Sequence, residues 1–425
     1  MLDLSTIMVI VGILVGVILL AIIALFALRS YLRSHASLKR TFDMVVLQLL
    51  IPKESAEKEG GGGGTEIQKI QEAISRTEAF FTSIGGLKAQ RGLKAWFTGR
   101  GDHLAFEIAV VGGHVKFFVA VPRGSQSYFE EQLHAQESNA YVEEARDYNI
   151  FQPSGVILMR TLSFKRPGYF PVKSYKKLEV DPLNALTNAM SKVTEADGAA
   201  LQYIVRSARK EWRRGGVRIA RRMQQGMSLD KASAGGFWKA ISGGFAAASG
   251  GKKKSGEPDK PYQLSPMEQE VVKGLEEKAA KFGMDVNVRI VASGPDRMRA
   301  QTILDSITQA FFQYNVPQYG NMFVASGASS KPKLIRQFIY RHFDEGRRIV
   351  LSVEEMASVW HLPLPSAETP NIQWLVARRL SPPVNMPQEG IIMGESVYRG
   401  RRVLVRMKPA DRRRHIYLIG GTGTG

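Results

Sequence analysis

The last residues of the sequence have the types and the spacing with the most specific chemistry. The apolar stretch 416–419 leads into residues 420–425, which match the first six positions of the phosphate-binding loop G-x-x-x-x-G-K-[ST]. Glycines suit such a loop, because backbone N–H groups converge on a phosphate through positive φ angles with no Cβ in the way. The pattern predicts the first strand and loop of a P-loop domain; a glycine-threonine tail with no role is the alternative. The positions expected to offer amides to a nucleotide are Gly420, Thr422, Gly423, Thr424 and Gly425.

The rest of such a nucleotide site is not among these 425 residues. In a complete loop the next lysine reaches the β- and γ-phosphates, and the hydroxyl after it holds Mg²⁺. A helix then directs its N-terminal dipole at the phosphates. We therefore expect residues 1–425 to bind ATP poorly and to hydrolyse none.

Residues 411–425, which read DRRRHIYLIGGTGTG, resemble the start of the motor domain of the FtsK/HerA-type DNA-pumping ATPases. The branch that they resemble most is the membrane-anchored coupling proteins of type IV secretion and conjugation. In that family a β-rich segment precedes the pattern R-H-x-x-x-x-G-x-T-G-x-G-K-S, and residues 390–406 occupy the matching place. The specific part of the resemblance is confined to this C-terminal end of the chain.

The resemblance implies a function for a longer parent protein. Gly420, Thr422, Gly423 and Gly425 would be nucleotide-loop positions, and Thr424 would offer only its backbone N–H. ATP and Mg²⁺ would bind to the complete motor, which would be a ring hexamer working with secretion-system proteins. Residues 1–425 would be the membrane anchor and cytoplasmic adaptor of that DNA-translocating ATPase, truncated within its Walker A loop.

A second group of residues suited to phosphate lies in the middle of the chain. Segment 206–222 holds eight arginines or lysines and one acid, Glu211. On a helix, Arg214, Arg218, Arg221 and Arg222 would share one face. Such a face could bind DNA phosphates or anionic lipid, or it could simply be solvated. The net charge of +19 favours both partners equally. The candidate phosphate or lipid contacts are Arg213, Arg214, Arg218, Arg221 and Arg222.

The N-terminal part of the sequence predicts a transmembrane helix at 5–30. Residues 7–28 are 22 apolar residues without charge or proline, and about 20 helical residues cross a bilayer core of about 30 Å. A signal-peptide core is shorter, and a core helix would show a polar stripe. Basic residues follow the run, which places the remainder in the cytoplasm under the positive-inside rule. We expect a single-pass protein of the inner membrane. The flanking basic residues are Arg29, Arg33, Lys39 and Arg40.

Other catalytic chemistry is absent from the sequence. There is no cysteine, which excludes disulfides and thiolate sites, and there is no HExxH or G-x-S-x-G pattern. The paired acids, such as Glu354 and Glu355, are adjacent in sequence and should point apart. We expect no catalytic residue and no metal site in this chain.

The strands and helices expected along the chain follow the order βαββαβ twice. This order predicts an α+β fold with two ferredoxin-like modules. Capping boxes are expected where Thr65 precedes Gln68 and where Ser265 precedes Glu268. Residues 112–113, both glycine, predict a two-residue hairpin turn.

The domain organisation follows from these elements. The glycine-rich stretches are expected to be flexible. The predicted parts are the membrane helix 5–30, a first module 31–148 with a flexible loop at 54–64, a second module 149–330 with a basic helical insertion and a flexible linker at 233–261, connecting helices and a β-rich segment 331–415, and the start of a P-loop domain at 416–425.

The function that fits best is the anchor and adaptor described above. The alternative is a membrane-tethered, non-enzymatic scaffold that binds DNA or anionic lipid through its basic surface.

Overall fold

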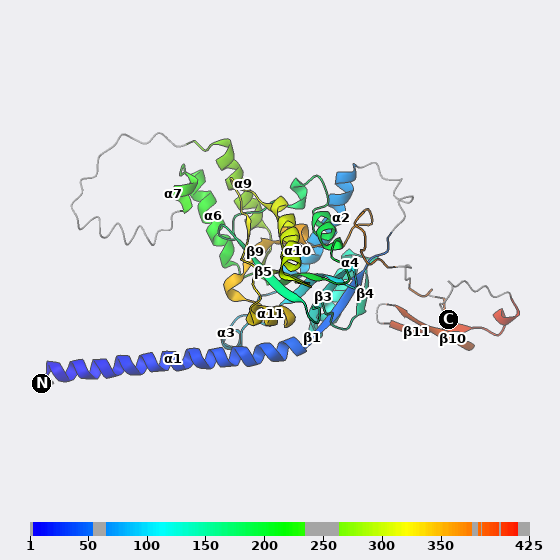
Figure 1. Ribbon diagram of the computed structural model, residues 1–425, viewed down its shortest axis with the longest axis horizontal. Helices are drawn as coiled ribbons and strands as arrows, with labels where there is room; N and C mark the ends of the chain where they lie inside the picture. Colours follow the sequence, from blue (N-terminus) through cyan, green and yellow to red (C-terminus); the bar gives the residue numbers. More distant parts are fainter. Residues whose placement is uncertain are drawn as a thin grey trace.

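The N-terminal helix α1 (Leu4–Phe42) is unbroken over 39 residues and runs out from the body of the protein (Figure 1). The computed structural model describes residues 3–53, 65–233, 263–375, 381–383, 385–398 and 401–414. Among them, α1 is the one helix long and apolar enough to cross a membrane, and none of its most apolar window is buried against the protein. The helix continues beyond the expected end at residue 30, up to the start of the sheet. The predicted flexible stretch 54–64, nearly all of the linker 233–261 and the segment 416–425 lie outside the described residues.

A nine-stranded sheet forms the body, with the order β4-β1-β3-β2-β6-β7-β5-β8 and with β9 paired to β7. Each of these pairings is antiparallel. The strands are β1 (Met44–Leu50), β2 (Leu104–Val111), β3 (His114–Pro122), β4 (Tyr141–Glu144), β5 (Val156–Phe164), β6 (Gly198–Ser207), β7 (Gly283–Gly294), β8 (Phe323–Ala325) and β9 (Ile349–Ser352).

The two halves of this sheet have the same strand order. The first half reads β4-β1-β3-β2 and the second reads β8-β5-β7-β6 from its outer edge inward. They meet where β2 pairs with β6, for example at Ile108 opposite Leu201. The mixed α+β class is therefore confirmed, and both halves share one continuous sheet.

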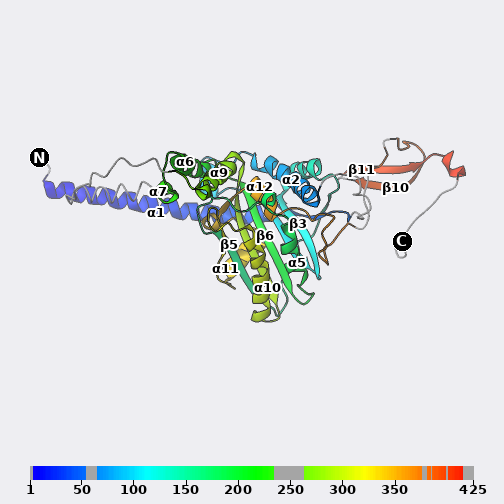
Figure 2. The same cartoon turned by 90° about the horizontal axis from the view of Figure 1, so that it is seen from above.

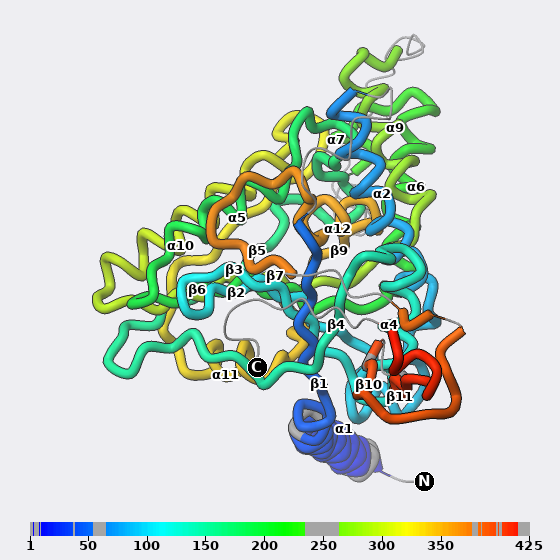
Figure 3. The backbone as a smooth tube through the Cα atoms, turned by 90° about the vertical axis from the view of Figure 1, so that its right-hand side faces the viewer, coloured from blue at the N-terminus to red at the C-terminus, as the bar shows by residue number. Residues whose placement is uncertain are grey.

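One face of the sheet carries most of the helices. Figure 3 shows α2, α5, α10 and α12 on the opposite side of the strands from α1 and α11. Their apolar residues join alternate strand residues in one large core, with an aromatic centre at Phe81, Phe106 and Trp360. The helices that contribute to this core are α2 (Glu66–Gly85), α4 (Gln126–Gln136), α5 (Leu183–Ser191), α10 (Arg297–Ala310) and α12 (Val353–Val359).

The other face is covered by α11 (Pro332–Ile339) and by irregular segments near residues 145–151 and 340–347. Its apolar cluster is smaller and includes Val46, Phe118 and Phe338. Short α3 (Leu93–Thr98) lies beside α1 on this side (Figure 1). Five short 3-10 helices complete the described chain: η2 (Arg123–Ser125), η3 (Tyr175–Lys177), η4 (Phe311–Tyr314), η5 (Glu345–Arg347) and η6 (Asp411–Arg413).

The basic insertion between β6 and β7 is helical, as predicted. It consists of α6 (Glu211–Gln224), α7 (Leu229–Ser233) and α9 (Pro266–Ala280), which pack around Ile219, Met223 and Leu275. Both predicted capping boxes are present, at the starts of α2 and α9. The glycines of the predicted β2–β3 turn, Gly112 and Gly113, have φ values of 60° and 74°, a conformation that favours glycine.

The C-terminal described residues form a separate two-stranded hairpin. Strands β10 (Ile391–Tyr398) and β11 (Arg401–Met407) pair with each other, within the segment that the sequence predicts to be β-rich. Figure 2 shows this hairpin at the opposite end of the sheet body from the free end of α1.

Candidate functional site

The predicted nucleotide-loop positions fall outside the described residues. Gly420, Thr422, Gly423, Thr424 and Gly425 are all in this group. The structure describes the chain only as far as Arg414, which follows η6.

The basic face of α6 is the predicted site whose geometry is described. Ile219 and Met223 lie on the side of α6 that packs against α9, so the opposite side faces solvent. On that side Arg214, Arg218 and Arg221 are exposed at spacings of four and three residues. Their side chains have no hydrogen-bond or ion-pair partner within the described part of the chain. This set, here called the α6 triad, is free to bind a polyanion.

The other two predicted contacts on α6 have structural partners. Arg213 donates a hydrogen bond to the carbonyl of Lys281. Arg222 Nη1 donates to the carbonyl of Ala232 at 3.2 Å. Three of the five predicted arginines therefore lie together on the exposed side of α6. The other two form hydrogen bonds within the protein.

The arginines after the apolar run of α1 hold the helix against the α3 region. Arg29 Nε donates to the carbonyl of Trp96 at 3.1 Å, and its guanidinium lies 4.2 Å from the centre of the Trp96 ring. Arg33 also reaches the Trp96 carbonyl, at 3.3 Å. Arg40 donates to the carbonyls of Thr98, Gly99 and Arg100 at 3.0, 2.9 and 3.0 Å. Three of the four basic residues predicted to set the topology therefore also attach α1 to the body.

Sequence reasoning missed the segment that α1 contacts. Within residues 87–96, three apolar side chains are 48%, 78% and 36% exposed: Leu87, Leu93 and Trp96. Three exposed basic residues lie among them: Lys88, Arg91 and Lys94. The available signal was this mixture of apolar and basic residues over a short stretch, which is typical of surfaces that meet a membrane.

A buried polar layer lies at the junction of the two halves of the sheet. Glu107 on β2 is fully buried and accepts hydrogen bonds from Arg341 Nε and Nη2, both at 3.0 Å, and from Gln202 Nε2 at 2.7 Å. Gln202 in turn accepts from Arg289 Nη1 at 2.9 Å. Burial alone would lower the pKa of Arg341, but the charges of Glu107 and Asp147 raise it above its usual value. Burial lowers the pKa of Arg289 to about 10. The arrangement pairs these buried groups with one another, which fits a structural role.

The same layer continues along β6 and β7 toward α3. Asp285 lies 3.3 Å from Arg206 and 3.5 Å from Arg100. Burial raises the pKa of Asp285 although these arginines act in the opposite direction. His103, the residue before β2, is buried, and its burial together with the charges of Arg206 and Arg40 lowers its pKa to about 4.

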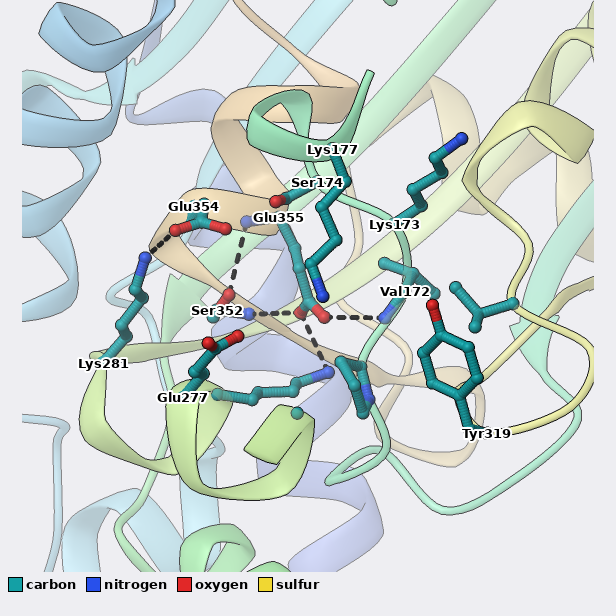
Figure 4. A pocket seen from close by; sticks show the side chains of 14 residues that line it. Val172, Lys173, Ser174, Lys177, Glu277, Lys281, Tyr319, Ser352, Glu354 and Glu355 are labelled. Carbon is teal, nitrogen blue, oxygen red and sulfur yellow. Dashed lines mark hydrogen bonds and ion pairs between the residues drawn. The ribbon is translucent and has the colours of Figure 1, made fainter. Parts of the chain in front are cut away.

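A small hollow lies between α9, α12 and residues 171–177 (Figure 4). Glu355 is at its base, where it accepts hydrogen bonds from the amides of Val172 and Ser352, both at 2.8 Å. It also pairs with the buried Lys278 at 2.8 Å, and burial lowers the pKa of that lysine. The cavity volume is about 40 Å³, whereas small-molecule sites usually enclose about 300–1,000 Å³. This hollow suits water and does not suit a nucleotide or cofactor. The neighbouring Glu354 points the other way, to Lys176 at 2.9 Å, as expected for adjacent acids.

Comparison with known families decides where this chain belongs. A family model described as a domain of unknown function, DUF8128, matches residues 67–375. The chain belongs to the DUF8128 family. No curated protein matches the sequence. The DUF8128 match covers most of both halves of the sheet, together with α3, the α6 triad and the buried polar layer. It does not include α1, the β10–β11 hairpin or the stretch 411–425.

Within the described residues of this DUF8128 protein, no group of three or more histidines or acids could hold a metal ion. Two surface features of the described residues are the α6 triad and the α3 region. Both are basic, and both lie toward the side from which the apolar end of α1 extends (Figure 1).

Proposed function

We propose that this chain is the membrane anchor and cytoplasmic adaptor of a DNA-translocating P-loop ATPase of the conjugation or type IV secretion kind. The observation that carries the proposal is the order of its parts. Helix α1, the sheet body and the β10–β11 hairpin follow one another along the long axis (Figures 1 and 2). A motor beginning at residues 411–425 would then stand on the side of the body away from the membrane.

The contacts of α1 support an anchor that stays attached. Its apolar window is exposed, so it lacks the packing of a core helix. The helix continues without a break into the segment where Arg29, Arg33 and Arg40 bond to the α3 region. A cleaved signal sequence would have no need of these contacts. The basic flank supports a single-pass helix in the inner membrane with the body in the cytoplasm.

The strand orders support two ferredoxin-like modules as the adaptor. Each half has the chain order strand, helix, strand, strand, helix, strand and the antiparallel sheet order 4-1-3-2 in its own numbering. We propose that these modules position neighbouring subunits of a ring hexamer and receive secretion-system partners. ATP and Mg²⁺ would be held by the parent motor. This chain would contribute only backbone amides from residues 420–425.

The gene downstream of codon 425 tests this proposal. A lysine codon followed by serine or threonine, and later a Walker B aspartate, is the expected result. Residues 1–425 alone should then show no ATP turnover. A stop codon directly after Gly425 would contradict the motor, and so would ATP turnover by residues 1–425 that is lost on changing Gly425.

A second candidate is a membrane-tethered scaffold that binds DNA or anionic lipid without a motor. The observation that favours it is the α6 triad, because three exposed arginines on one helix face have no partner within the described residues. This candidate needs no residue beyond those described.

The scaffold candidate predicts salt-dependent DNA binding through α6. Replacing Arg214, Arg218 and Arg221 by glutamine should reduce the slope of log K against log salt by about 2.7, since each lost phosphate contact removes about 0.9. Fluorescence anisotropy of labelled duplex DNA with the full chain in detergent measures this slope. A control variant with the same charge change, at exposed Arg123, Arg297 and Arg336, should keep the original slope. Equal slopes for both variants, or no binding, would remove DNA as a ligand of α6.

A further inference from the structure

The α3 region lies at the level where the apolar part of α1 ends. The last apolar residue of the run is Leu28, and the next residue, Arg29, bonds the Trp96 carbonyl and stacks on its ring. Residues 7–28 of α1 would measure about 33 Å as a helix, close to the thickness of a bilayer core of about 30 Å. If α1 spans a membrane as proposed above, Trp96 lies at the boundary between hydrocarbon and headgroups.

The exposed side chains of this region suit that boundary. Leu93 begins α3 directly after Gly92, whose φ of 92° favours glycine, and Leu93 is 78% exposed. Leu87 and Trp96 are also exposed. Tryptophan is enriched at membrane interfaces, because its ring is apolar while its N–H needs a polar partner. Arg29 lies on one face of the Trp96 ring, and within the described chain all three side chains still keep at least a third of their surface exposed.

The charge of the region selects the kind of membrane. Lys88, Arg91 and Lys94 are exposed between the apolar residues, and Arg29 on α1 adds a fourth basic residue beside Trp96. Among the described residues Arg91 pairs with Glu211 at 4.0 Å, and both side chains are more than half exposed. A surface of this kind is attracted to anionic headgroups, and the attraction fades within a Debye length of about 8–10 Å.

We propose that residues 87–96 form a second membrane contact, in which Leu87, Leu93 and Trp96 enter the headgroup region of an anionic leaflet. Lys88, Arg91 and Lys94 bind its phosphates. This inference rests on the proposed membrane span. The inference adds a fixed orientation of the body relative to the membrane, because a second contact beside α1 prevents the body from rotating about the helix. The partner that residues 87–96 bind is a lipid surface, because the segment adjoins the point where α1 would leave the bilayer.

Single-cysteine labelling tests the inference, because the native chain has no cysteine. The full chain carrying Leu93→Cys with a polarity-sensitive fluorophore is reconstituted in phosphatidylcholine vesicles with or without phosphatidylglycerol. A lipid with a spin label near its headgroup serves as the quencher. Met298→Cys is a matched control, because Met298 is also 78% exposed and its helix α10 lies further from the apolar end of α1 (Figure 1). Ile18→Cys, midway along the apolar run, reports on the span itself, with a quencher in the acyl chains.

The expected result is a blue-shifted, lipid-quenched label at position 93 in vesicles with phosphatidylglycerol, and an unquenched label at position 298. Adding Lys88→Glu, Arg91→Glu and Lys94→Glu should abolish quenching at position 93 and leave position 18 quenched. If position 18 is quenched while position 93 responds like position 298, the second contact is overturned and the span stands. If position 18 is itself unquenched, the proposed span fails, and this inference fails with it.

Discussion

Replacing Glu107 by alanine should lower the free energy of unfolding by about 3–5 kcal/mol, the usual cost of breaking a buried charge pair from one side. The variant removes the acceptor of two hydrogen bonds from Arg341 and one from Gln202. Arg341 is 7% exposed in the native chain, and the variant leaves it only Asp147, whose side chain is half exposed, as a carboxylate partner. The arginine is then a poorly compensated charge between the two halves of the sheet. Chemical unfolding of the full chain in detergent, followed by circular dichroism, measures the loss.

Two comparison variants separate the buried charge from general damage. Glu107→Gln keeps the shape and one acceptor oxygen, so a smaller loss of about 1–3 kcal/mol is expected. Asp305→Ala breaks the Arg160–Asp305 pair of 2.6 Å, whose acid is 43% exposed, and should cost less than about 1 kcal/mol. Equal losses for Glu107→Ala and Asp305→Ala would contradict the structural role of the buried polar layer.

The second large effect is a loss of stability in mild acid caused by His103. Its pKa is lowered to about 4 by burial, with a further contribution from Arg206, Arg40 and His342 that exceeds the opposing effect of Asp102. In the unfolded chain the imidazole titrates near its ordinary value of about 6.5. As the pH falls through this window, the unfolded state takes up a proton that the folded state does not, so stability falls with pH. The expected contribution is about 2 kcal/mol between pH 7 and pH 5.

The comparison with His103→Gln isolates this contribution. Glutamine cannot be protonated in this range, so the variant should lose less stability than the native chain between pH 7 and pH 5. The histidines and acids elsewhere are the same in both proteins and cancel in the difference. Parallel pH profiles for the two proteins would show that His103 does not titrate as its buried position requires.

The predicted elements that the structure confirms depend on local interactions. The capping boxes at Thr65 and Ser265 and the turn at Gly112–Gly113 involve residues within a few positions of each other. Asp296 likewise caps α10, and its side chain accepts from the Arg299 amide at 2.7 Å. Such signals are readable because the groups that satisfy one another are neighbours in the chain.

The buried polar layer could not be predicted in this way. On β7, Asp285, Asn287 and Arg289 alternate with apolar residues, which is typical of a strand with one solvated face. The structure buries every residue of β7, because α11 and the segment 340–347 cover the polar side. The partners of these groups are distant in sequence, as Arg341 is from Glu107. Pairings between such distant residues are determined by the tertiary structure and cannot be read from a local sequence pattern.

The sequence by itself determined the apolar length of α1, its basic flank, the mixed α+β class and the basic character of α6. Each of these depends on composition or on spacing within one element. Only the tertiary structure decided that both halves share one sheet through β2 and β6. It also decided which arginines of α6 remain exposed, and that α3 lies beside Arg29 where the apolar run ends. These outcomes depend on contacts between residues far apart in the chain, and no local pattern specifies such contacts.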